Sequence, residues 1–135
     1  MTRYFLETSV IISYLRSEKG VVDAINRLEG ELTSSYLCLA ELYEGVARSK
    51  ESKKVEQGVT DFFHGLDEIY GVDESIAKYF GTIRAALKKR GEIIEDMDIL
   101  MAATCLAYEA TLITANIKHF QRIENLKLFS LEIRS

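Results

Sequence analysis

The sequence predicts an α/β/α sandwich, in which helices cover both faces of a central, mainly parallel β-sheet. Short apolar runs alternate with longer segments of helical period, and this alternation is typical of β-α-β units with right-handed crossovers. The 135 residues contain no proline, no internal repeat and no low-complexity tract. We therefore expect one uninterrupted domain over residues 1–135, which is long enough to bury a core of its own.

Strand and helix signals alternate through the first half of the chain. The expected strands are residues 4–6, 31–37 and 67–73. The expected helices run from a cap at Thr8 or Ser9 to about residue 15, and over residues 21–28, 39–49 and 54–66. Within residues 21–28, for example, Val21, Ile25 and Leu28 share one helical face because they lie three or four residues apart.

The second half predicts two helices followed by two strands. The first helix covers residues 74–89 and is ended by Gly91, because glycine readily adopts the left-handed conformation that closes a helix. Residues 98–110 are apolar nearly all round, so we expect a buried helix there. A strand over residues 111–116, with a turn at its end, and a last short strand within residues 128–133 complete the predicted sheet.

Composition and charge exclude several classes of protein. Hydrophobic residues make up 47% and charged residues 28% of the chain, and no apolar run approaches the roughly 18 residues of a membrane span. We expect no membrane partner, and we expect a cytoplasmic protein because the N-terminus is unlike a signal peptide. Cys38 and Cys105 form no CxxC pair, so we interpret them as reduced core residues.

Polar residues lie where the predicted sheet ends. Glu7 directly follows the first strand and Asn116 follows the "TLIT" strand, and ligands of parallel sheets bind beyond the carboxyl ends of the strands. Glu41 begins a helix within an otherwise apolar stretch. Asp98 lies in the first turn of a helix that has no polar face, where Asp96 is expected to be the cap. Taken alone, each of these acids more often has a structural than a catalytic role. Taken together with Asn116, they predict one polar pocket.

Such a pocket favours a divalent cation. Two ionised carboxylates about 4 Å apart repel by roughly 4 kcal/mol at an effective dielectric constant of 20, so a cluster of them stays ionised only around a cation. A set of oxygen ligands without cysteine or histidine favours Mg²⁺ or Mn²⁺ over Zn²⁺. The sequence therefore predicts a metal-assisted hydrolase, with the acids acting mainly as ligands.

Three segments carry a resemblance to a known family. They are "FLETSVII", "CLAELYEGV" and "EDMDILMAATCLAYEATLITANIKHFQRI". In this order they resemble the PIN-domain family, specifically the VapC-type ribonuclease toxins of bacterial and archaeal toxin–antitoxin pairs, over essentially the whole chain. The resemblance implies a PIN-like fold and a Mg²⁺ (or Mn²⁺) dependent endoribonuclease. It also implies a homodimer, a cognate antitoxin protein, and an RNA substrate such as tRNA or another structured RNA.

The resemblance also implies roles for individual residues. The implied catalytic residues are Glu7, Glu41, Asp98 and Asn116, of which Glu7 and Asp98 are the implied metal ligands. The implied supporting residues are the hydroxyl-bearing Thr8 and Thr114 and, as an outer candidate, Asp96.

One position departs from the family pattern. The first acid of the family is nearly always aspartate, and this chain has Glu7, whose additional methylene moves the carboxylate by about an ångström. This leaves a second interpretation open, a weakened or inactive PIN-domain protein that binds RNA or antitoxin without cleaving. A phosphoacceptor signalling domain is disfavoured, because it needs paired acids after the first strand and "LETS" contains one.

Aromatic and apolar residues on two neighbouring predicted helices suggest where a protein partner binds. Because aromatic residues are enriched at interface hot spots, we expect an antitoxin groove near these side chains. The residues are Tyr36, Leu39, Tyr43, Phe62 and Phe63.

Overall fold

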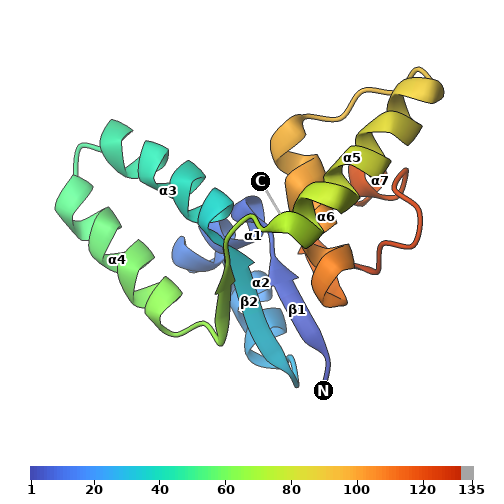
Figure 1. The fold of residues 1–135 in the computed structure, drawn as a ribbon. Coiled ribbons are helices and arrows are strands. Elements are labelled where there is room, and N and C mark those ends of the chain that lie inside the picture. Colours follow the sequence, from blue (N-terminus) through green and yellow to red (C-terminus); the bar gives the residue numbers. More distant parts are fainter. Residues whose placement is uncertain (132–135) are drawn as a thin grey trace.

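The computed structural model describes residues 1–131 and contains one five-stranded sheet flanked by helices (Figure 1). All four strand pairings are parallel, in the order β3-β2-β1-β4-β5. The strands are β1 (Arg3–Leu6), β2 (Glu31–Ser35), β3 (Glu68–Tyr70), β4 (Ala110–Thr114) and β5 (Leu128–Ser130). The predicted α/β/α sandwich is confirmed, with a sheet that is entirely parallel.

Helices cover both faces of this sheet. They are α1 (Thr8–Leu15), α2 (Lys19–Asn26), α3 (Tyr36–Arg48), α4 (Ser52–His64), α5 (Glu74–Lys89), α6 (Asp96–Tyr108) and α7 (Ile117–Phe120). The chain moves from β1 to β3 in one direction along the sheet and from β3 to β5 in the other, so right-handed crossovers put α1–α4 on one face and α5–α7 on the opposite face. Figure 1 shows the hairpin of α3 and α4 reaching away from the sheet, with α5 and α6 on the other side of the molecule.

The centre of the core lies on β1 and β4. Phe5 and Leu6 pair in register with Leu112 and Ile113, and all four side chains are completely buried. Consecutive residues of a strand point to opposite faces of a sheet, so complete burial of consecutive residues means that both faces are covered. Continuous apolar runs in these two strands are therefore what a sheet between two helical layers requires.

Ser35 determines where β2 becomes α3. Its hydroxyl oxygen accepts hydrogen bonds from the backbone N–H groups of Leu37 and Cys38, at 3.2 and 3.3 Å. The expected strand over residues 31–37 was therefore too long, because this N-cap starts the helix at Tyr36. Cys38 and Cys105 are buried and unbridged, as expected for core residues.

Two predicted helix caps are wrong. Glu7, rather than Thr8 or Ser9, occupies the N-cap position of α1, and both hydroxyls donate to carboxylates instead. Glu95 occupies the N-cap position of α6, and Asp96 is its first helical residue. Neither Glu7 nor Glu95 caps its helix through its side chain.

The C-terminal part contains an element that the sequence did not predict. The short helix α7 follows β4, where the sequence indicated only a turn. β5 spans Leu128–Ser130, and residues 132 and 133 of the expected last strand lie outside the described residues. Within residues 1–131, none of the helices combines the length and the apolar character needed to cross a membrane.

A glycine substitution tests the close approach of the chain segments before β1 and β2. Gly30 has a φ of 155°, and a Cβ added there would collide with the backbone carbonyl of Thr2. We expect Gly30→Ala to lower the free energy of unfolding by more than about 1 kcal/mol, measured by urea denaturation. The matched control is Gly81→Ala in α5, where a Cβ meets nothing within 4 Å, and it should raise stability by about 0.5–1 kcal/mol. Equal effects of the two substitutions would contradict this account.

Candidate active site

The strand order creates a switch point between the ends of β1 and β4. After β1 the chain continues to β2 on one side, and after β4 it continues to β5 on the other, so the connections diverge at this point. Such a switch point in a parallel sheet is where ligands bind. Glu7 follows β1 directly, and Thr114 is the last residue of β4. The Glu7 N–H donates to the Ile113 carbonyl at 3.2 Å, which holds the two strand ends together.

Hydroxyl groups hold the Glu7 carboxylate at this switch point. The buried Thr114 hydroxyl donates a short hydrogen bond to Glu7 Oε1, and the Ser9 hydroxyl donates to Oε2 at 3.0 Å. Thr114 Oγ1 in turn accepts the backbone N–H of Asn116 at 2.9 Å. The predicted supporting residue Thr114 therefore connects Glu7 to the segment that contains Asn116. Ser9 takes part as well, although the sequence analysis did not select it as a site residue.

A second hydroxyl–carboxylate pair joins α1 to α3. Thr8, which is buried, donates from its hydroxyl to Glu41 Oε1 at 2.6 Å. Glu41 lies in the second turn of α3 and is exposed to solvent despite its apolar sequence neighbours. Because Thr8 adjoins Glu7 in sequence, the two pairs place Glu41 and Glu7 on neighbouring parts of the same edge.

Asp98 lies in the first turn of α6, and its side chain is 23% exposed. Its pKa is raised mainly because burial disfavours the charged carboxylate, while the charges of Glu7 and Glu95 act in the same direction. The imidazole of His119 opposes this shift. The charge of Glu7 therefore acts on Asp98, although the two residues are far apart in the sequence.

His119 is a site residue that the sequence analysis missed. Its Nε2 atom lies 3.0 Å from Asp98 Oδ2, and its side chain is 24% exposed. The two residues form no short sequence motif, because most of α6, all of β4 and the start of α7 lie between them. A usable signal was the position of His119 three residues after Asn116, on the segment that leaves the carboxyl end of β4.

The remaining predicted site residues are peripheral in this arrangement. Asp96 is exposed, and its Oδ1 atom pairs with Arg84 Nε of α5 at 3.1 Å rather than joining Glu7. Asn116 is exposed beside Thr114 and contributes its backbone N–H to the hydrogen bonds described above. Asp96 therefore has a structural partner, whereas Asn116 is exposed just after the end of β4.

The donor atoms fit a divalent cation that is shared with water and substrate. Among residues 1–131, no three His, Cys, Asp or Glu side chains are grouped closely enough to hold a metal by themselves. Mg²⁺, however, usually binds through one or two carboxylates and keeps several waters or phosphate oxygens. The oxygen donors of Glu7 and Asp98 match this pattern. The nearby Cys38 does not compete as a thiolate, because burial raises the pKa of its thiol.

Known proteins share both the sequence pattern and the fold. The family model of the PIN domain matches residues 4–126. The chain is 35% identical over 130 residues to ribonuclease VapC2 of Rickettsia felis, covering 93% of this chain and 95% of the relative. It is 33% identical to ribonuclease VapC1 of Methanocaldococcus jannaschii, covering 98% and 87%. A crystal structure of VapBC2 from Rickettsia felis bound to a promoter DNA fragment matches with a TM-score of 0.89 and 30% identity, covering 96% of this chain and 99% of that chain. The chain belongs to the PIN domain family, as its three motif segments predicted.

Proposed function

We propose that the protein is a Mg²⁺- or Mn²⁺-dependent endoribonuclease, the toxin of a toxin–antitoxin pair, and that it acts in the cytoplasm. The observation that carries the proposal is the position of two carboxylates at the switch point of the sheet, Glu7 directly after β1 and Asp98 in the first turn of α6. The names of the relatives in Rickettsia felis and Methanocaldococcus jannaschii, both ribonucleases, support RNA as the substrate.

In this mechanism each side chain has a separate task. Glu7 and Asp98 would hold the divalent cation, which supplies charge stabilisation at the scissile phosphate and a water of lowered pKa. Thr114 keeps the Glu7 carboxylate oriented, as Thr8 does for Glu41. The exposed Glu41 carboxylate would accept the proton of the attacking water.

The exposed segment after β4 would contact the RNA backbone. The exposed Asn116 amide would donate to a phosphate oxygen of the bound strand, next to the reacting group. Because the nucleophile is water rather than the 2′-hydroxyl of the RNA, the products would carry a 5′-phosphate and a 3′-hydroxyl.

A groove between α1, α3 and α4 is the proposed antitoxin site. It has a volume of about 550 Å³, and the residues lining it include the apolar Ile12 and Leu42 and the basic Arg48 and Lys54. Glu41 also lines it, so a segment bound here would lie against the proposed active site. The similarity to solved structures of VapBC2 from Rickettsia felis and VapBC-1 from nontypeable Haemophilus influenzae supports a protein partner.

None of the five side chains that the sequence analysis placed near a groove lines this one, although they lie on the same two helices. Tyr36 and Tyr43 are 57% and 41% exposed, so both are available on α3. Phe63 is only 3% exposed and belongs to the core, and Phe62 packs on Tyr14 with ring centroids 5.2 Å apart. We further propose that the toxin is a homodimer, as the family resemblance implies.

Replacing Asp98 tests the proposed metal site. We expect Asp98→Asn to reduce metal-dependent RNA cleavage to the level seen with chelator, because it removes one of two carboxylate ligands. Mn²⁺ at a hundredfold excess over its Kd should stabilise the parent protein by about 2.7 kcal/mol and should leave the melting temperature of the variant unchanged. Initial cleavage rates on a structured RNA, together with melting curves, measure both effects.

Asp96→Asn is the matched control, because it removes an acid of the same helix turn that is paired with Arg84 instead. It should cleave RNA and respond to Mn²⁺ as the parent does. Without metal, Asp98→Asn should be at least as stable as the parent at neutral pH, since burial penalises the charged form of Asp98. Cleavage by Asp98→Asn at the parental rate would refute the metal-nuclease mechanism.

Glu7→Asp separates the nuclease from its non-cleaving alternative. We expect faster cleavage by Glu7→Asp than by the parent, because aspartate restores the shorter reach that is usual in the family and Mg²⁺ tolerates little distortion of its octahedral geometry. The measurement is the initial rate at saturating Mn²⁺. A slower variant would mean that the backbone has adapted to glutamate, and that glutamate is the better ligand at this position. Cleavage by neither protein would favour a binding role.

A charged residue in the groove tests the antitoxin site. Val55 lines the groove and is 37% exposed, so Val55→Glu should weaken antitoxin binding by at least tenfold, about 1.4 kcal/mol, without loss of folding. Val72→Glu is the matched control, because Val72 is 53% exposed and lies between β3 and α5, outside the groove. Titration of the purified cognate antitoxin measures both affinities, and equal affinities would exclude this groove.

A further inference from the structure

His119 lies between a carboxylate and a guanidinium group. Its Nε2 atom is 3.0 Å from Asp98 Oδ2, and its Nδ1 atom is 3.4 Å from Arg122 Nη2. The ring also packs edge-on against Phe120, with centroids 5.5 Å apart. Each ring nitrogen therefore faces one charged partner, and the two partners have opposite requirements for the imidazole proton.

Arg122 determines which nitrogen of His119 is protonated. A guanidinium group has only N–H donors and no acceptor, so the nitrogen that faces it must offer a lone pair. Nδ1 is therefore the unprotonated nitrogen of the neutral imidazole, and the proton resides on Nε2. This tautomer puts the N–H group on the nitrogen that lies 3.0 Å from Asp98 Oδ2, although the N–H is not aligned with that oxygen as in a hydrogen bond. The carboxylate can only accept when it is ionised.

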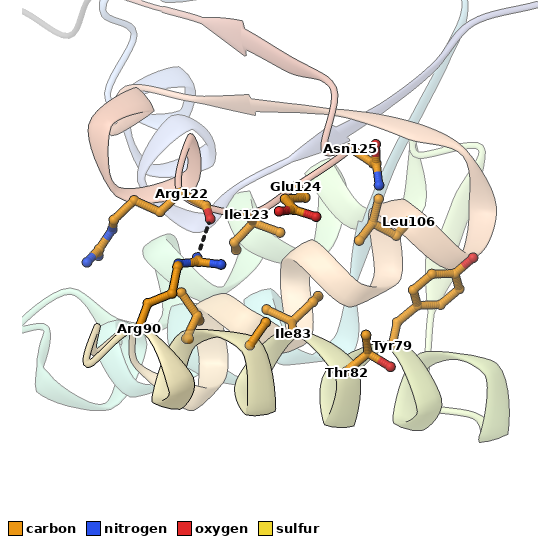
Figure 2. A pocket seen from close by; sticks show the side chains of 11 residues that line it. Tyr79, Thr82, Ile83, Arg90, Leu106, Arg122, Ile123, Glu124 and Asn125 are labelled. Carbon is orange, nitrogen blue, oxygen red and sulfur yellow. Dashed lines mark hydrogen bonds between the residues drawn. The ribbon is translucent and has the colours of Figure 1, made fainter.

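Backbone contacts fix Arg122 in place. Its Nε and Nη2 atoms donate to the carbonyls of His119 and Ile93, each at 3.3 Å. The Arg122 carbonyl accepts from Arg90 Nη2 at 2.8 Å, beside a cavity of about 240 Å³ between α5 and residues 122–125 (Figure 2). Figure 2 shows that the Arg122 side chain turns away from this cavity. The arginine is thus held at both its backbone and its side chain.

We infer that His119 is a positioning residue, which orients the Asp98 carboxylate through its Nε2–H group, and that Arg122 sets the required tautomer. Nε2 is buried without a hydrogen bond among the described residues, and Asp98 Oδ2, 3.0 Å away, is the acceptor that we propose for it. The role of this contact in metal binding rests on the proposed function. The assignment of the tautomer is independent of that function. Groups that orient ligands in this way typically contribute 10–100-fold to metal affinity or activity.

The tautomer is measured on the metal-free protein. Nitrogen-15 labelling of both histidines and a long-range proton–nitrogen correlation spectrum, recorded about two pH units above the ordinary imidazole pKa of about 6.5, identifies the protonated nitrogen. We expect a slowly exchanging proton on Nε2 of His119 in the parent. We expect an exchange-averaged spectrum in Arg122→Met, like that of the exposed His64. A proton on Nδ1 of His119, or a parent spectrum that matches His64, would overturn the inference.

Paired variants test the role of the contact. His119→Leu keeps much of the ring volume but loses the donor, and we expect it to weaken Mn²⁺ binding about tenfold to a hundredfold in calorimetry. His119→Gln places an amide N–H near the position of Nε2 and should restore most of the affinity. His64→Leu is the control for removal of a histidine, and it should bind Mn²⁺ as the parent does.

The outcomes separate this inference from the proposed function. If the parent binds Mn²⁺ and His119→Leu binds it equally well, the positioning role is wrong and the proposed function stands. If the parent binds no Mn²⁺, the proposed function fails, and the spectrum of the metal-free protein still decides the tautomer. Weakened binding in His119→Leu with recovery in His119→Gln supports the role, since a general packing defect would not be repaired by a polar amide.

Discussion

The parallel pairing of β1 with β4 is the interaction on which the rest of the structure depends. It brings Leu6 beside Ile113 and therefore Glu7 beside Thr114, two residues that are 107 positions apart in the sequence. Both strands are buried on both faces, so their register is determined by the core. A slip by one residue would turn buried side chains toward the wrong layer and would separate the Glu7 carboxylate from its hydroxyl partner. The precision of the candidate site is thus a consequence of core packing.

The same arrangement reduces the repulsion between the carboxylates in the absence of a cation. α1 and α3 each follow a strand, and α6 runs back from this edge toward the start of β4, so all three helices begin near the carboxyl ends of the strands. Helix N-termini carry partial positive charge, typically worth about 0.3–1 kcal/mol to a nearby anion. Glu7 and Asp98 each lie at such a terminus, and hydroxyl or imidazole groups contact both of them. Together these contacts offset part of the repulsion between the carboxylates.

Much of the fold could be predicted from sequence because its signals are local. Alternating apolar runs indicated the strands, and the wholly apolar segment that begins near Asp98 indicated a buried helix. The predicted helix boundaries were wrong where a polar side chain had two possible partners. Thr8 and Ser9 resemble helix caps, but their hydroxyls donate to carboxylates. Ser35 caps α3 from within the predicted strand. The partner of Thr8 is 33 residues away in sequence, so no local pattern could have indicated it. Ser9 and Ser35 bind neighbouring residues, and there the sequence pattern allowed either role.

The acids of the candidate site could be predicted from the sequence. The groups that contact and orient these acids could not. Glu7 and Asp98 stand out because an acid next to an apolar run needs an explanation, whereas His119 lies on a short polar segment where a histidine needs none. The contact between Asp98 and His119 exists only because α6 and α7 cover the same face of the sheet. Arg122 is one step further removed, since it acts on Asp98 through His119 and has no contact with the carboxylates itself. The sequence therefore indicates where charge must be compensated, while the tertiary structure determines which neighbouring groups orient that charge.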